Sequence, residues 1–286
     1  MPFSETAALG ALAGFTIFLG LPVGRLTPLG RRSRVALAMF SMGVLAFIFL
    51  DVLSNAVGIV HTGLHQFQHH QRSIGYVIWL VVLLAAGFTG GSAGLAMLEQ
   101  RLRPLGSRQP PIAGGATSTI TIDEADALAA ELEETRRRAL RTGLTIAAAI
   151  GLHNFAEGLA IGVSARAGAI SLATVLIIGF ALHNATEGFG IVGPLGGVRP
   201  SWKWLAVAGL IGGGPTFLGT MVGYAVTSHA LELAFYALAG GAILYVIGEV
   251  WNAMRRLGHR ELGLLMLSAG FMLGVVTDLV ITYGGG

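Results

Sequence analysis

The hydrophobic pattern of this chain is a series of long apolar runs separated by short polar segments. Crossing the apolar core of a bilayer takes about 20 mostly apolar residues in a helix. Eight runs are long enough: 6–23, 35–60, 74–98, 142–164, 169–193, 202–227, 231–254 and 262–283. No basic residue precedes the first run, so we expect a helix there rather than a signal peptide. The pattern predicts an all-α integral membrane protein, residues 1–286 forming one domain with eight transmembrane helices.

Composition supports a membrane protein over a soluble one. Hydrophobic residues make up 53% of the 286 and charged residues 12%, against about 25% charged residues in soluble domains. The 43 glycines suit closely packed membrane helices and would allow a homodimer. The chain has no cysteine, which excludes disulfides, thiolate metal sites and cysteine nucleophiles.

Basic residues predict the orientation of the helices. All but two of the 18 lysines and arginines fall in segments 24–34, 99–141, 194–203 and 255–261, and the exceptions are Arg72 and Arg166. Because basic loops stay on the cytoplasmic side, both termini are expected outside the cytoplasm. These basic residues therefore indicate contact with the surface of a lipid bilayer and no nucleic-acid partner. The short chain and compact loops fit a bacterial plasma membrane.

The 99–141 segment is the one long loop and is predicted to be cytoplasmic. Its first half is rich in Pro, Gly and Ser, which is typical of a linker. Its second half begins with Thr121 and Glu124 at the spacing of a helix capping box. We expect this helix to run directly into the fourth span.

Ionisable residues inside the apolar runs carry the functional signal. A carboxylate in the middle of a membrane costs roughly 2.5–3.5 kcal/mol, so each must be protonated, paired, hydrated or bound to a cation. The residues concerned are Asp51, His153, Glu157, His183, Glu187, Glu249 and Asp278.

A repeated hexapeptide brings four of these residues together. Residues 153–158 read HNFAEG, and residues 183–188 read HNATEG. The His and Glu of each motif lie four residues apart, on one helical face, and the two spans run antiparallel. Imidazole and carboxylate ligands together favour Zn, Fe, Mn or Cd over Mg or Ca. A buried His–Glu ion pair is the alternative, but the repetition favours a metal site between helices 4 and 5.

With these paired motifs, the chain resembles the ZIP metal transporters (ZRT/IRT-like, solute carrier family 39), here of prokaryotic type. The resemblance extends to eight spans, outside termini and a cytoplasmic loop after the third span. It implies a mid-membrane metal site whose ligands in this sequence are His153, Asn154, Glu157, His183, Asn184 and Glu187.

Other features of the family are partly kept. The GAILYV run at 241–246 is followed by Glu249, and the last span keeps Asp278. Asp51 stands where the family commonly has a histidine, and Gly214 where it often has a glutamate serving a second metal. These departures from the family pattern predict one principal metal position, or a site whose second position is weak.

Histidines outside the spans form a second group. His61, His65 and His69 recur every four residues, and His70 follows. This segment is interpreted either as a metal-collecting patch near the entrance or as a polar interfacial loop, and Gly63 argues against a helix there.

These observations predict a transporter, not an enzyme. Its bound substrate is expected to be Zn²⁺, or else Cd²⁺, Fe²⁺ or Mn²⁺, with no further cofactor. Alternating access would move the ion from Asp51 through the His/Glu site to Glu249 and the cytoplasm, with Asp278 near the opposite end or acting as a gate. An intramembrane metal-dependent hydrolase, a metal channel and a metal sensor are the competing hypotheses.

Overall fold

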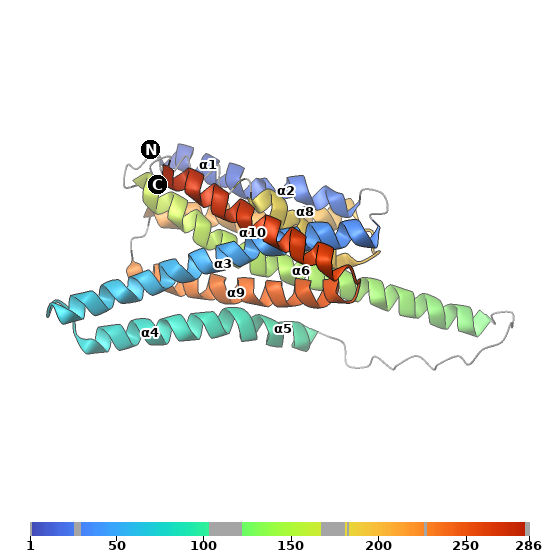
Figure 1. Cartoon of the computed structure of the whole chain (residues 1–286), viewed down its shortest axis with the longest axis horizontal. Helices are drawn as coiled ribbons and strands as arrows, with labels where there is room; N and C mark the ends of the chain where they lie inside the picture. The colour runs from blue at the N-terminus through green and yellow to red at the C-terminus, as the bar shows by residue number, and fades with distance from the viewer. Residues whose placement is uncertain are drawn as a thin grey trace.

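The computed structural model is a bundle of long helices (Figure 1). It describes residues 2–25, 30–102, 122–166, 181, 183–225 and 228–283. The elements are α1 (Phe3–Phe15), α2 (Ile17–Gly20), a 3-10 turn (Leu21–Gly24), α3 (Arg31–Gln68), α4 (Ile74–Thr89), a π-helical turn (Gly90–Gly94), α5 (Leu95–Leu102), α6 (Ile122–Arg166), a 3-10 turn (Gly193–Leu195), α8 (Trp202–Ala225), α9 (His229–Arg255) and α10 (Arg260–Tyr283).

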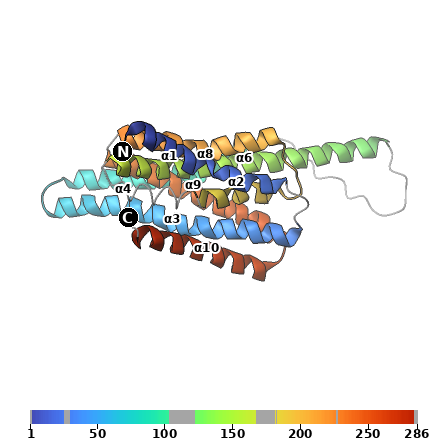
Figure 2. The same cartoon turned by 90° about the horizontal axis from the view of Figure 1, so that it is seen from above.

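Seven helices among the described residues are long and apolar enough to cross a membrane. They coincide with seven of the eight predicted runs. The remaining run, 169–193, lies partly outside the described residues. Within its described part, residues 183–192 are helical. The start of α1 and the end of α10 lie at the same end of the bundle (Figures 1 and 2).

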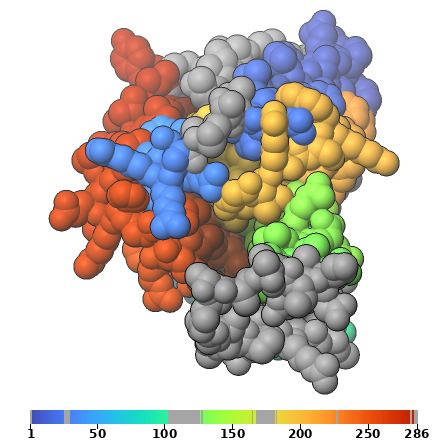
Figure 3. Space-filling view, turned by 90° about the vertical axis from the view of Figure 1, so that its right-hand side faces the viewer, coloured from blue at the N-terminus to red at the C-terminus, as the bar shows by residue number. Residues whose placement is uncertain are grey.

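The opposite end of the bundle gathers the basic segments. Figure 3 looks onto this end and shows the starts of α3 and α8 beside the connection from α9 to α10. At the far end, the Arg166 guanidinium donates hydrogen bonds to the carbonyls of Tyr224 and Ala225, at 2.7 and 3.1 Å. The structure thus separates Arg166 from most of the other arginines, as the charge pattern predicted.

Helix α6 joins the predicted loop helix and the fourth span in one continuous helix of 45 residues, as expected. Its first part projects beyond the bundle (Figures 1 and 2). Exposed pairs such as Arg138 Nε to Glu134 Oε1, at 2.9 Å, follow the helical spacing of four residues. The predicted capping residue Thr121 lies outside the described residues.

Glycines set the distance between α6 and α8, and so fix the backbone of the predicted site. A Cβ added to Gly158 of α6 would stand 2.1 Å from the carbonyl oxygen of Thr216, and one added to Gly219 of α8 would stand 2.1 Å from that of Phe155. No side chain fits at such distances, so the two helices pack backbone to backbone.

The histidine segment and the predicted loop boundary both differ from expectation. Helix α3 continues to Gln68, so most of the predicted 61–70 loop is helical. Gly63 does not end the helix, because its missing side chain makes room for Leu80 of α4, whose Cδ1 lies 2.7 Å from an added Cβ. Likewise α5 extends to Leu102, so the predicted loop 99–141 begins inside a helix.

Candidate metal site

Two helices supply the candidate ligands. His153 and Glu157 lie one turn apart on α6, with 0% and 5% of their surfaces exposed. His183 and Glu187 lie one turn apart on the helical residues 183–192. Burial of so many polar groups at one level of an apolar bundle requires that they compensate one another or bind a cation.

Three of these side chains converge on one point. The Glu157 Oε1 atom lies 2.8 Å from His153 Nε2 and 2.5 Å from His183 Nε2. One ligand atom from each of the three residues lies within 4.8 Å of the other two. Nitrogen and oxygen ligands bind zinc at about 2.0–2.2 Å, so these three atoms can reach one ion with small side-chain movements.

Glu187 lies beside this group. Its Oε1 is 3.8 Å from His153 Nε2, and its Oε2 accepts a hydrogen bond of 3.1 Å from Asn154 Nδ2. The carboxylate of Glu187 is fully buried and is held at the edge of the three-residue cluster as a potential fourth ligand.

The two asparagines use their amide nitrogens to hold neighbouring groups. Besides Glu187, Asn154 Nδ2 donates to the carbonyl of Gly212 on α8, at 2.9 Å. Asn184 Nδ2 donates to the carbonyl of Ala13 on α1, at 3.1 Å. Asn154 is thus placed with the acidic side chains, whereas the amide of Asn184 is tied to α1.

Several buried oxygens and nitrogens of this site have no hydrogen-bond partner among the described residues. They are His153 Nδ1, Asn154 Oδ1, Glu157 Oε2, Asn184 Oδ1 and Glu187 Oε1. An unpaired buried polar atom costs about 1–3 kcal/mol. A bound cation would offset part of this cost by drawing on the free oxygens.

A cavity of about 280 Å³ leads to the three-residue cluster, and both predicted acids Asp51 and Asp278 line it. Asp51 Oδ1 accepts a hydrogen bond of 3.3 Å from Asn55 on the next turn of α3. Because Asp278 shares this cavity with Asp51, the prediction that it stands near the opposite end of the route is wrong. The parallel course of α10 beside α3 brings the two carboxylates to one level.

A neighbouring hollow of about 420 Å³ extends toward the connection between α3 and α4. It shares Asn55 and Tyr236 with the first cavity, and its wall includes Arg72, His229 and Glu232. His229 Nδ1 lies 3.6 Å from Glu232 Oε2. The two hollows adjoin at Asn55 and Tyr236, and polar side chains line both of them between this end of the bundle and the candidate ligands.

Glu249 lies in a separate cavity of about 430 Å³, between α5, α6 and α9. The same cavity contains Glu99, which sequence reasoning missed because the third span was ended at residue 98. Glu99 is buried, and Tyr245 Oη donates a hydrogen bond of 2.7 Å to its Oε2. Its position only three residues before Leu102 in an apolar helix is the signal that could have revealed it.

Two of the outer histidines form a pair. His65 Nε2 and His69 Nε2 lie 3.1 Å apart, on the last turns of α3. His70 follows with φ 57°, a left-handed conformation that ends the helix. Two of the four predicted histidines thus direct a ring nitrogen toward one point.

Comparison with known proteins bears on this arrangement. Residues 123–247 match the model of the family described as ZIP zinc transporter. The Zinc transporter ZupT of Clostridium perfringens is 32% identical over 146 residues, which cover 49% of this chain and 51% of that protein. Over this segment the chain is similar to the ZIP family.

The ZIP segment runs from the start of α6 into α9, so it contains both His-Asn-x-x-Glu-Gly motifs. The chain spans about half the length of the curated relative that it matches. With seven helices able to cross a membrane, it is a multi-pass membrane protein. Asp51, Glu249 and Asp278 lie outside the segment that matches the family model.

Proposed function

We propose that this protein carries divalent transition-metal ions, zinc first among them, across the membrane into the cytoplasm. The observation that carries the proposal is the convergence of His153, Glu157 and His183 at a buried point reached by a polar cavity. The family match, and the relative named for zinc transport, support the same class of substrate.

The proposed binding step uses these three residues as first ligands. Glu157 bridges two imidazoles before the ion arrives, so the ion replaces one or both of those contacts. Glu187 then completes the ligand set, and its charge neutralises the second positive charge of the ion. The free Oδ1 atoms of Asn154 and Asn184 are weaker candidates, because the amide nitrogen of each already holds a neighbour.

The proposed route enters at the end of the bundle where α3 meets α4 and passes Asp51 and Asp278. Because basic segments stay on the cytoplasmic side, the proposal takes that end, and with it both termini, to lie outside the cytoplasm. The cavity beside Glu249 would be the exit. It shares no lining residue with the cavity beside Asp51, and this separation supports a route that opens to one side at a time. A homodimer stays a prediction.

The paired imidazoles of His65 and His69 fit the predicted metal-collecting role. Two nitrogens 3.1 Å apart provide two of the ligands that zinc takes, which favours weak and reversible capture. Replacing both with glutamine should raise the zinc concentration needed for half-maximal uptake without changing the maximal rate.

Metal uptake into proteoliposomes with an internal fluorescent indicator tests the proposal. Zinc, cadmium, manganese and iron(II) are compared for the wild type, Glu157→Gln and Glu133→Gln. Glu133 is an exposed residue of the same helix, so its variant makes the same change of charge away from the site. We expect saturable uptake that is lost in Glu157→Gln and kept in Glu133→Gln.

Other outcomes would assign a different function. Uptake that does not saturate with metal concentration would indicate a channel. Zinc binding with no uptake of any metal would indicate a sensor or an enzyme. Normal uptake by Glu157→Gln would refute the assignment of the site.

A further inference from the structure

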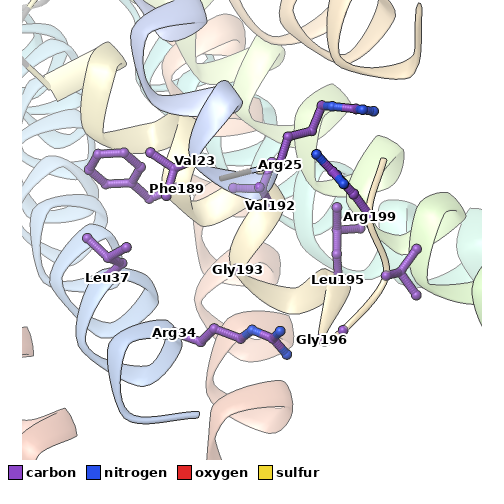
Figure 4. Close-up of a pocket in the computed structure, with 13 residues that line it drawn as sticks. Val23, Arg25, Arg34, Leu37, Phe189, Val192, Gly193, Leu195, Gly196 and Arg199 are labelled. Atoms are coloured by element: carbon purple, nitrogen blue, oxygen red, sulfur yellow. The ribbon is translucent and has the colours of Figure 1, made fainter. Parts of the chain in front are cut away.

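Three arginines line a pocket at the end of the bundle opposite to the two termini. Arg25, Arg34 and Arg199 come from the end of the first span, the start of α3 and the segment before α8. The pocket has a volume of about 240 Å³. In Figure 4 the side chains of Arg25 and Arg199 lie on one side of it and that of Arg34 lies across from them.

The position of the Arg25 guanidinium is set by contacts with neighbouring segments. Arg25 donates a hydrogen bond of 2.5 Å to the carbonyl of Pro200, and its guanidinium carbon lies 4.8 Å from the centre of the Trp202 ring. The Arg34 guanidinium lies near Gly197, since one of its nitrogens is 3.9 Å from the position of an added Cβ there. Arg25 and Arg34 are half-buried, unlike the exposed neighbours Arg31 and Arg32.

Their positive charges are not neutralised within the described part of the chain. None of the three forms an ion pair with a described carboxylate, and no acidic residue lines the pocket. The buried Nε of Arg25 also lacks a hydrogen-bond partner there. Three cations around one pocket, with a free buried donor, favour an anion with several acceptor oxygens, and guanidinium groups match phosphate oxygens in geometry.

Apolar side chains form the rest of the wall. They are Val23, Leu37, Phe189, Val192, Leu195 and Val198. Trp202, which is 63% exposed beside Arg25, is the kind of residue that lies at the headgroup level of a membrane. A ligand with a phosphate at one end and an apolar body at the other would contact both parts of this wall.

We propose that Arg25, Arg34 and Arg199 form a binding site for a phosphate group. Because the rest of the wall is apolar, the ligand that fits it is an anionic phospholipid, whose headgroup carries the phosphate. The site joins the first span, α3 and the segment between residue 192 and α8, so a bound lipid would hold three separate segments together. It lies apart from the candidate metal ligands, and the proposal does not depend on metal transport.

Lipid binding by the delipidated full chain in detergent tests this site. Phosphatidylglycerol and phosphatidylcholine are added separately, and retained lipid is measured by native mass spectrometry. The test variant is Arg34→Gln/Arg199→Gln, which leaves the Arg25–Pro200 contact intact. The control is Arg31→Gln/Arg32→Gln, which removes the same charge from exposed positions nearby. The unfolding midpoint without lipid shows whether each variant is folded.

We expect the wild type and the control to retain phosphatidylglycerol equally, and the test variant to bind it at least tenfold more weakly. If the test variant does not fold, Arg34→Gln alone should still weaken binding several-fold. Displacement of the lipid by millimolar inorganic phosphate, with the same dependence on Arg34 and Arg199, would support the phosphate site but assign it to a soluble ligand. Equal phosphatidylglycerol binding by the two double variants would overturn the proposal.

Discussion

The role of Asn154 in the structure differs from the role that the sequence predicts. As a metal ligand it would act through its oxygen, whereas the structure uses its nitrogen to donate to Glu187 Oε2 and to the Gly212 carbonyl. Replacing it with alanine removes both hydrogen bonds at a fully buried position. The Gly212 carbonyl lies within α8 and keeps its helical donor, whereas the Glu187 oxygen is left unpaired. An unpaired acceptor costs about 1–3 kcal/mol, so Asn154→Ala should destabilise the metal-free protein by about 1–3 kcal/mol.

The substitution Asn154→Asp separates the two roles. Aspartate keeps an oxygen ligand but loses the donor, and it places a second carboxylate where the amide now contacts Glu187 at 3.1 Å. If Asn154 acts mainly by holding Glu187, Asn154→Asp should be as unstable as Asn154→Ala without metal. Zinc should then restore stability in Asn154→Asp far more than in Asn154→Ala, because the ion relieves the repulsion between the two carboxylates.

Thermal unfolding in detergent, with and without zinc, measures both effects. Asn252→Ala is the matched control, because Asn252 is an exposed asparagine that lines the cavity beside Glu249. An unfolding midpoint of metal-free Asn154→Ala that equals that of Asn252→Ala would refute the positioning role. Equal stability of metal-free Asn154→Asp and wild type would show that the donor is dispensable.

Three further predictions follow from the geometry. Gly158→Ala places a Cβ 2.1 Å from a backbone oxygen of α8, whereas the Cβ of the control variant Gly248→Ala meets nothing within 4 Å. Only Gly158→Ala should lower the unfolding midpoint and the yield of folded protein. Equal midpoints for the two variants would contradict the backbone packing. Tyr245→Phe removes the donor to buried Glu99, so it should lower the maximal zinc uptake rate more than the apparent zinc affinity, and an unchanged rate would argue against an exit at this cavity. Zinc binding requires neutral imidazoles and displaces protons from its ligands, so the zinc affinity measured by titration should fall as the pH is lowered, whereas a flat profile would exclude His153 and His183 as ligands.

The helices were predictable from sequence because each span must bury its own backbone polar groups in lipid. That requirement makes long apolar runs visible without any tertiary information. The candidate ligands were predictable for a related reason, since a charged residue in such a run is costly and a repeated pair of them is difficult to explain by packing. The structure places His153, Glu157 and His183 together accordingly.

Features that depend on contacts between helices were not predictable. Nothing in the local sequence indicates that the nitrogen of Asn154 faces Glu187, or that Asp278 lies at the level of Asp51. Gly63 was interpreted as a helix breaker because an isolated glycine weakens a helix, but its missing side chain accommodates Leu80. Tertiary packing offsets the local preference there, and α3 continues for another turn.

The distribution of charge connects the two proposed sites. Carboxylates lie along the hollows that lead to the metal ligands, whereas unpaired arginines gather at the opposite end, around the first span and the start of α8. A divalent cation is attracted to the first set and repelled by the second. If an anionic lipid neutralises Arg25, Arg34 and Arg199, it also lowers the electrostatic barrier for a metal ion that leaves at that end. Zinc uptake should then be faster in vesicles containing phosphatidylglycerol than in phosphatidylcholine alone, and Arg34→Gln/Arg199→Gln should remove the difference.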